Sequence, residues 1–227
     1  SGTTVTITFA REGVNEPLIK SIVRAPIEIP TVETKVLPEG VFVIELYNFS
    51  AVSPNLFRAA LREFVESGNN KLIIDLRNNP GGYLGAALDM ASWFLPTGKV
   101  VVTEDFGDKR EAHLYKSKGY DVFNENLKMA ILVNQGSASA SEILAGALKE
   151  YGKAVLVGEK TFGKGSVQEL VPVTNDTSLK ITVAHWSTPL GNSISNGGLL
   201  PDIEVKLTPE NTKDGNDPQL DAAVKYL

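Results

Sequence analysis

Short apolar runs that alternate with helical patterns constrain this chain more than any other feature. The runs at 71–76, 128–134 and 153–159 carry few polar residues, as strands buried on both faces of a parallel sheet do. A further strand pattern, at 99–106, belongs to the same alternation. The intervening segments have helical spacing and cover residues 53–70, with Ser53 as N-cap, then 83–95 and 139–151. Strands that alternate with helices imply right-handed βαβ crossovers, so we predict an α/β fold with a mainly parallel core sheet.

The rest of the chain has a different pattern. After residue 166, strand patterns follow one another without helices, which indicates antiparallel additions to the core, and a short helix is expected over 218–227. Residues 40–50 predict a further strand. Residues 3–10 alternate β-branched and polar side chains, and a hairpin there would be marginal alone.

Charge and composition exclude several classes of function. The 227 residues carry a net charge of −5, whereas nucleic-acid and anionic-membrane surfaces need a basic excess. No apolar run approaches the roughly 20 residues of a membrane span. The chain has no cysteine, which excludes disulfides and thiolate metal sites.

Two loops stand where a parallel sheet gathers its reactive groups. RNNPGG, at 77–82, follows one apolar strand, and NQGSAS, at 134–139, follows the next. Ligands and catalytic groups of such sheets lie at the carboxyl ends of the strands. The sequence therefore predicts a site between these loops.

The serines in the second loop have two interpretations. Ser139 and Glu142 fit the capping box S-x-x-E, which is a purely structural role. A serine at a helix N-terminus is also exposed, and the nearby amides stabilise a developing oxyanion. The two interpretations are compatible, so spacing alone does not choose between them.

GEKTFGKGS, at 158–166, is nearly a phosphate-binding loop. Gly165 stands where that motif needs a hydroxyl, and the next residues predict a strand where the motif needs a helix. Lys164 is either a solvated turn lysine or a general base. A lysine base must be neutral, so its pKa must fall from about 10.4 toward about 7, and burial in a dry cleft supplies such a fall.

The alternatives to a lysine base have less support. His113 lies in a polar stretch and His185 at a strand end beside Trp186, and neither belongs to a triad motif. No cluster of His, Asp and Glu has metal-ligand spacing.

Three motifs together resemble one known family. DLRNNPGG at 75–82, SASASEILAGAL at 137–148 and GEKTFGKGSVQ at 158–168 are similar to motifs of the tail-specific, or carboxy-terminal processing, proteases of the S41 type. The similarity extends over essentially the whole chain in the family's order. The resemblance implies a core like that of ClpP and the crotonases, an extracytoplasmic location and serine endopeptidase activity.

The resemblance also implies roles for individual residues. Ser139 corresponds to the nucleophile of a Ser-Lys dyad, Lys164 to its general base, and Gln168 to a glutamine that orients the lysine. The backbone amides of Gly82 and Ala140 correspond to the oxyanion hole. No cofactor or metal is implied.

Two details follow from these assignments. Residues 164 and 168 are expected on one strand face, where full extension would separate them by about 13 Å. Direct contact would need the chain to curl at Gly165. Glu150 falls where some relatives carry an acidic residue, and we do not rank it with the dyad.

The implied partners are unfolded or C-terminally exposed polypeptides, with a homo-oligomer or an adaptor as further options. The alternative is a non-catalytic protein on the same fold that binds peptides or hydrophobic ligands. Family members usually carry a PDZ domain before the core. We expect residues 1–25 to be a remnant of that module with its linker, 26–207 the catalytic domain, and 208–227 a tail with a short helix.

Overall fold

The computed structural model describes residues 1–11, 13–27, 30–195 and 197–227. Glu12 of the expected PDZ remnant, and Glu28, Ile29 and Asn196 of the expected catalytic domain, lie outside the described residues. The chain divides into two compact units, Ser1–Pro30 and Thr31–Leu227.

The first unit is a two-stranded antiparallel hairpin of β1 (Thr4–Phe9) and β2 (Leu18–Val23). Its apolar side chains are largely exposed: Ile19 keeps 66% of its surface in contact with solvent and Val23 keeps 63%. A hairpin with so little burial gains almost nothing from the hydrophobic effect.

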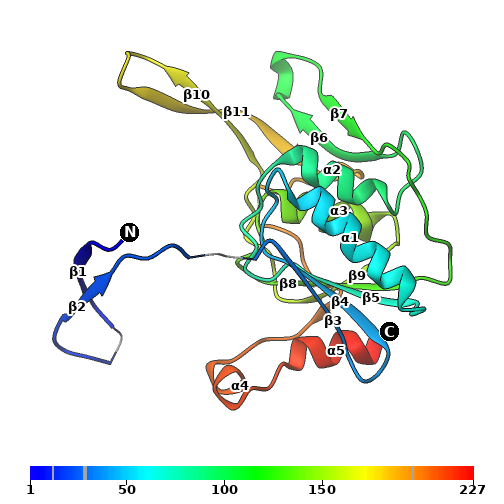
Figure 1. Ribbon diagram of the computed structural model, residues 1–227. Coiled ribbons are helices and arrows are strands. Elements are labelled where there is room, and N and C mark those ends of the chain that lie inside the picture. The colour runs from blue at the N-terminus through cyan, green and yellow to red at the C-terminus, as the bar shows by residue number, and fades with distance from the viewer. Residues whose placement is uncertain (12, 28–29, 196) are drawn as a thin grey trace. The chain divides into compact units, whose positions relative to one another are not determined.

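The second unit is built on a six-stranded sheet with the order β12-β9-β8-β5-β4-β3 (Figure 1). All neighbouring pairs are parallel except β3 with β4. The predicted α/β fold with a mainly parallel core sheet is therefore confirmed. The strands are β3 (Val32–Val36), β4 (Val41–Leu46), β5 (Lys71–Asp75), β8 (Lys128–Val133), β9 (Val155–Gly158) and β12 (Ile203–Glu204).

Both faces of the central strands are buried, which explains their continuous apolar runs. Along β8, Met129, Ile131 and Val133 pack into the core beneath α1, α2 and α3, while Ala130 and Leu132 pack into the core on the side of α5. None of the helices that the structure describes is long and apolar enough to cross a membrane. The helices are α1 (Ser53–Glu66), α2 (Leu84–Ser92), α3 (Ala140–Glu150), α4 (Pro209–Asp214) and α5 (Pro218–Tyr226).

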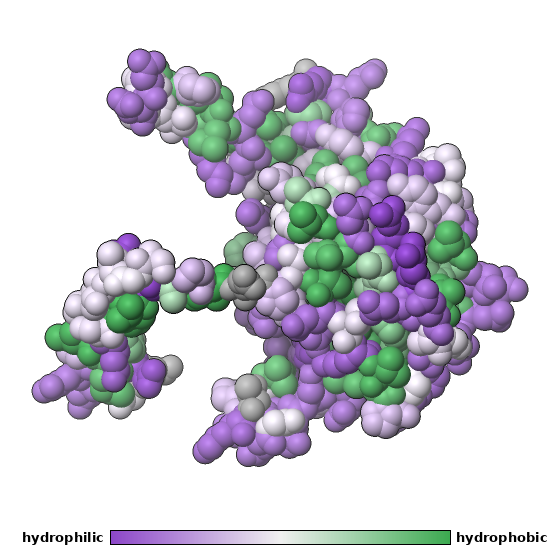
Figure 2. All heavy atoms as spheres, viewed as in Figure 1, coloured by the Kyte–Doolittle hydropathy of each residue, from purple (hydrophilic) through white to green (hydrophobic). Residues whose placement is uncertain are grey.

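A separate antiparallel sheet has the order β10-β11-β6-β7. β6 was expected to belong to the core alternation, but it pairs with β11 and β7 in this second sheet. β10 and β11 continue past this sheet as an arm on which Leu170, Val173 and Leu179 are exposed (Figures 1 and 2). The elements are β6 (Val100–Asp105), the 3-10 turn Gly107–Lys109, β7 (His113–Lys116), β10 (Ser166–Pro172) and β11 (Ser178–Ser187).

Two local expectations were wrong. The N-cap of α1 is Val52, and Ser53 lies inside the helix with its hydroxyl donating to the carbonyl of Ser50 at 2.8 Å. The segment around β12 was expected to extend the antiparallel part, yet β12 pairs in parallel with β9 at the edge of the core sheet.

Arg77 fastens the C-terminal helix to the carboxyl edge of the core sheet. Its guanidinium donates to Asp75, at the end of β5, and to Asp217, the N-cap of α5, at distances of 2.6–3.1 Å. Burial raises the pKa of the Asp217 carboxyl, but hydrogen bonds from Arg77 and from backbone amides outweigh it and hold that pKa below its ordinary value. The clamp therefore stabilises the ionised carboxylate in the folded state.

We expect Asp217→Asn to lower the free energy of unfolding by about 2 kcal/mol at pH 7, because the charge-assisted bonds to Arg77 are weakened and a negative charge is removed from the N-terminus of α5. A lowered folded-state pKa contributes stability above the unfolded pKa of about 3.9, and this contribution is lost as the pH falls through the folded value. The difference between variant and parent should therefore shrink below about pH 4. Urea unfolding across pH 3–7 measures it.

Asp221→Asn is the matched control, since Asp221 is an exposed carboxylate in the first turn of the same helix. Its effect should stay within about 0.5 kcal/mol. A difference for Asp217→Asn that stays constant down to pH 3 would contradict the clamp.

Candidate functional site

Three loops meet at the carboxyl edge of the core sheet: 76–83, 134–139 and 159–165 (Figure 1). The first two are joined by the amide of Ala138, which donates to the carbonyl of Asn79 at 3.0 Å. The second and third are joined by the Phe162 amide, which donates to the Ser137 carbonyl at 3.0 Å. The parallel sheet thus assembles in one place all three motifs that the sequence singled out.

Ser139 lies between β8 and α3 in a strained conformation. It is the N-cap of α3, and its backbone has φ 55° and ψ −114°. A residue other than glycine in such a region costs about 1–3 kcal/mol, and strain of this kind is typical of functional sites. A sharp, strained turn from strand to helix is also how many hydrolases expose a serine nucleophile. Ser139 itself is half-buried.

The two serines that flank Ser139 have structural roles. The hydroxyl of Ser137 donates to the carbonyl of Leu76 at 2.7 Å, and the hydroxyl of Ser141 donates to the carbonyl of Asn79 at 2.9 Å. Both side chains are fully buried. In the Ser-Ala-Ser-Ala-Ser stretch, the first and last serines therefore bond the 76–83 loop, and the strained Ser139 lies between them.

The amide of Ala140 follows Ser139 directly in the chain, and the amide of Gly82 follows Gly81, which packs against Ser139. A Cβ atom at Gly81 would stand 2.8 Å from both Ser139 Cβ and the nitrogen of Ala140, so only glycine allows the loops to approach this closely. Among the residues that the structure describes, neither the Gly82 amide nor the Ala140 amide donates a hydrogen bond to another residue. Both N–H groups are available to an incoming oxygen.

Asn79 is a residue whose role we did not predict from the sequence. It is fully buried, its side-chain amide donates to the carbonyl of Leu46 at 2.7 Å, and its side-chain oxygen accepts from the amide of Gly81 at 2.9 Å. Its own carbonyl receives the bonds from Ala138 and Ser141 described above. Asn79 therefore fixes the glycine turn against the helix. An asparagine two residues before a glycine pair is the only sequence signal for it.

Glu142 joins Ser139 to the lysine-bearing loop. Its carboxylate is fully buried, and Oε2 accepts from the backbone amides of Ser139 at 2.8 Å and Lys164 at 2.9 Å. Since both backbone nitrogens bond the same oxygen, the distance between them cannot exceed the sum of the two bond lengths, 2.8 Å plus 2.9 Å, or 5.7 Å. Oε1 accepts from the hydroxyl of Thr161 at 2.6 Å and the amide of Gly163 at 2.7 Å. The Glu142 half of the predicted capping box is thus present, and the carboxylate has further partners.

The side chains of Lys164 and Gln168 are both exposed, so the dry cleft expected around the lysine is absent from this structure. Within the described part of the chain, no hydrogen bond joins either side chain to Ser139 or to the other. The lysine backbone nevertheless stands beside the serine, and a lysine side chain is long and flexible.

The sequence suggested that residues 164 and 168 share a strand face, but in the structure they do not. β10 begins only at Ser166, and its pairing with β11 shifts register between Val167 and Gln168. Gly165 does not have a positive φ. It is needed for a close approach, because a Cβ atom there would stand 2.3 Å from the nitrogen of Ser195. A strand does follow Lys164, in agreement with the argument against a phosphate-binding loop.

The other candidates take part in other contacts. Nδ1 of His185 lies 2.9 Å from the hydroxyl of Ser195, and the ring of His113 packs edge-on against Tyr115. Glu150 accepts from Thr188 and from other groups of the 188–192 turn, at the far end of α3. Among the described residues, no group of three His, Asp or Glu side chains could hold a metal ion.

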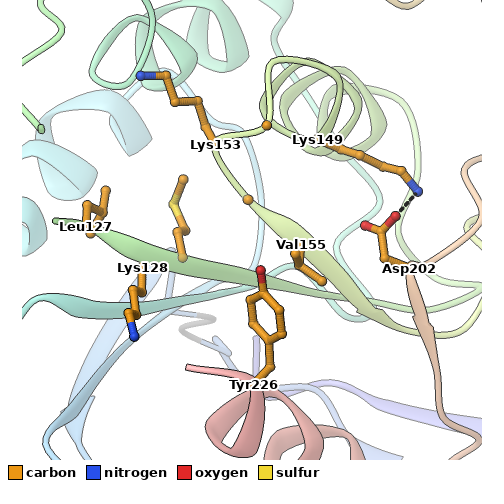
Figure 3. Close-up of a pocket in the computed structure, with 10 residues that line it drawn as sticks. Leu127, Lys128, Lys149, Lys153, Val155, Asp202 and Tyr226 are labelled. Atoms are coloured by element: carbon orange, nitrogen blue, oxygen red, sulfur yellow. Dashed lines mark ion pairs between the residues drawn. The ribbon is translucent and has the colours of Figure 1, made fainter. Parts of the chain in front are cut away.

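A pocket of about 510 Å³ opens at the opposite edge of the sheet, where β8 and β9 begin (Figure 3). Lys128, Lys149 and Lys153 line it with Tyr226, and Lys149 pairs with Asp202 at 2.8 Å. None of the candidate residues lies there. This pocket is therefore not where the three motifs meet.

Comparison with known proteins agrees with the arrangement of the three loops. Residues 40–205 match the model of peptidase family S41. The chain is 38% identical over 212 residues to the carboxy-terminal processing protease CtpB of Bacillus subtilis, covering 90% of this chain and 43% of that protein. It is 37% identical over 212 residues to a carboxy-terminal-processing protease of Bartonella bacilliformis, covering 91% and 48%. The chain thus spans less than half the length of these two relatives.

Among solved structures, the photosystem II D1 C-terminal processing protease superposes with a TM-score of 0.77 at 27% identity, covering 91% of this chain and 56% of that one. The family match covers more than half of the chain and includes the loops that carry Ser139 and Lys164. The resemblance inferred from the three motifs is therefore confirmed, and the chain belongs to peptidase family S41.

Proposed function

We propose that this chain carries the catalytic machinery of a serine endopeptidase that uses a Ser139–Lys164 dyad. The observation that carries the proposal is the strained backbone of Ser139 at the N-terminus of α3, beside the free amides of Gly82 and Ala140. A nucleophile and an oxyanion site are thereby preorganised at one point. Membership of family S41 supports the same chemistry.

In the proposed reaction, the hydroxyl oxygen of Ser139 attacks the carbonyl carbon of the peptide bond while its proton passes to the neutral amine of Lys164. The tetrahedral oxygen takes up the negative charge and accepts hydrogen bonds from the amides of Gly82 and Ala140. The resulting ammonium returns the proton to the leaving nitrogen as the C–N bond breaks, leaving an acyl-enzyme. Water then attacks the ester through the same steps and restores the serine.

The proposal requires Lys164 to turn from solvent toward Ser139. The shared bond to Glu142 keeps the two backbones adjacent, so rotations within the lysine side chain suffice and the loop need not move. A bound polypeptide covers this region and excludes water, which favours the neutral amine. Catalytic hydrogen bonds are often long or unaligned before substrate binds.

The proposed substrates are unfolded polypeptides or proteins with an exposed C-terminus, and the proposed location is extracytoplasmic. Both proposals rest on the family, whose named relatives are carboxy-terminal processing proteases. Gln168 is proposed to orient the lysine once the side chain has turned inward.

We expect Ser139→Ala and Lys164→Ala each to lower the rate of casein cleavage by at least about 10³-fold, since each removes a group that acts in the transition state. Fluorescence-labelled casein and the purified chain measure the rate. Lys160→Ala is the matched control, because Lys160 is an exposed lysine of the same loop, and it should cleave at the parent's rate.

Cleavage by Ser139→Ala at the parent's rate would refute the proposal. A parent chain that binds casein without cleaving it would instead favour the non-catalytic binding protein.

The rate of cleavage should rise with pH from about 6 to about 9, because only the neutral form of a lysine accepts the proton of serine. The initial rate against pH, with folding checked by circular dichroism at each point, measures this. A profile that levels off above a group titrating near pH 6.5 would indicate histidine as the base and contradict the dyad.

A further inference from the structure

We infer that Glu142 is a positioning residue for the proposed reaction: its buried carboxylate holds the backbone of the lysine-bearing loop in register with the nucleophile. This inference rests on the proposed function. Glu142 itself does not touch the reacting atoms. It acts through Ser139 and Lys164, whose backbone amides both donate hydrogen bonds to its Oε2 atom.

The number of bonds exceeds what a helix cap needs. A capping box asks of the N3 glutamate only one bond, to the amide of the N-cap residue. Glu142 makes that bond with Ser139 and then accepts three more, from Thr161, Gly163 and Lys164. All three lie in a loop that follows another strand, outside α3. The carboxylate therefore connects two separate elements of the site.

The energetics explain why the connection is rigid. A carboxylate with no solvent contact is costly unless its oxygens are satisfied, and each oxygen of Glu142 has two donors. The N-terminus of α3 adds a favourable dipole. Moving the lysine-bearing loop away would break up to three charge-assisted bonds at once. The carboxylate thus restricts the loop to one position.

A glutamine at this position cannot keep all four bonds. Its amide group is a donor and would face two other donors, whichever way it is turned. In one orientation of the amide, the bonds from Ser139 and Lys164 would be lost, and in the other orientation those from Thr161 and Gly163 would be lost. The side-chain volume hardly changes, so Glu142→Gln tests the hydrogen bonds with little effect on packing.

The experiment compares Glu142→Gln with Glu150→Gln on a quenched-fluorescence peptide that the parent chain cleaves. Glu150 lies on the same helix and accepts three bonds from the 188–192 turn, which contains no proposed catalytic residue. We expect kcat to fall about 30-fold in Glu142→Gln, with KM within threefold, because a misplaced base slows chemistry more than binding. Glu150→Gln should lose stability to urea but keep kcat within threefold.

Thr161 supplies a milder pair of variants in case Glu142→Gln does not fold. Thr161→Val removes one donor to Oε1, whereas Thr161→Ser retains the hydroxyl. We expect kcat to fall about fivefold or more in the valine variant and to return to within twofold of the parent in the serine variant. A role in stability alone would change the urea midpoints of these variants and leave kcat intact.

The outcomes separate the two proposals. If the parent cleaves the peptide and Ser139→Ala does not, but folded Glu142→Gln retains kcat within threefold, then the positioning role is wrong and the dyad stands. The same conclusion follows if Thr161→Val retains kcat. If Ser139→Ala cleaves as fast as the parent, the proposed function fails and the positioning role fails with it.

Discussion

The arrangement of the site depends on one buried carboxylate. Glu142 has no solvent contact and receives four hydrogen bonds, which draw the first turn of α3 and the loop after β9 onto the same pair of oxygens. A buried charge demands donors, and here two of the four donors are the backbone amides of Ser139 and Lys164, which the proposed chemistry needs side by side. Without it, the loops that carry Ser139 and Lys164 would still be joined by the bond from the Phe162 amide to the Ser137 carbonyl, but no bond would connect Ser139 and Lys164 through a shared acceptor.

The core sheet brings the first turn of α3 and the loop after β9 close together. Its central strands are parallel and buried on both faces, so the loops that follow β5, β8 and β9 all emerge at one edge. Asn79 and the two buried serines then fix the glycine turn against α3. On the other face, Arg77 joins the end of β5 to α5. Packing places the loops, and hydrogen bonds set their final positions.

Rigidity is unevenly distributed within the site. The backbones around Ser139 and around Gly81 are held by buried bonds, whereas the side chains of Lys164 and Gln168 are exposed to solvent. The proposed base accepts the proton of serine only in its neutral form. The proposed chemistry therefore uses a preorganised serine and oxyanion site together with a base whose side chain becomes ordered when substrate excludes water.

From the sequence alone we predicted the α/β class, the central strands and the helices α1, α2, α3 and α5, because buried strands and amphipathic helices have local periodicities. The sequence also indicated the two glycine-rich loops and Ser139, since motifs are local. The sequence did not show that β6 pairs outside the core sheet, that Gly165 permits a close approach to Ser195, or that Glu142 bonds the lysine-bearing loop as well as capping α3. Only the tertiary structure decided these features, together with the exposure of Lys164 to solvent. These features arise from contacts between residues distant in sequence, and no local pattern encodes which donors will surround a buried oxygen.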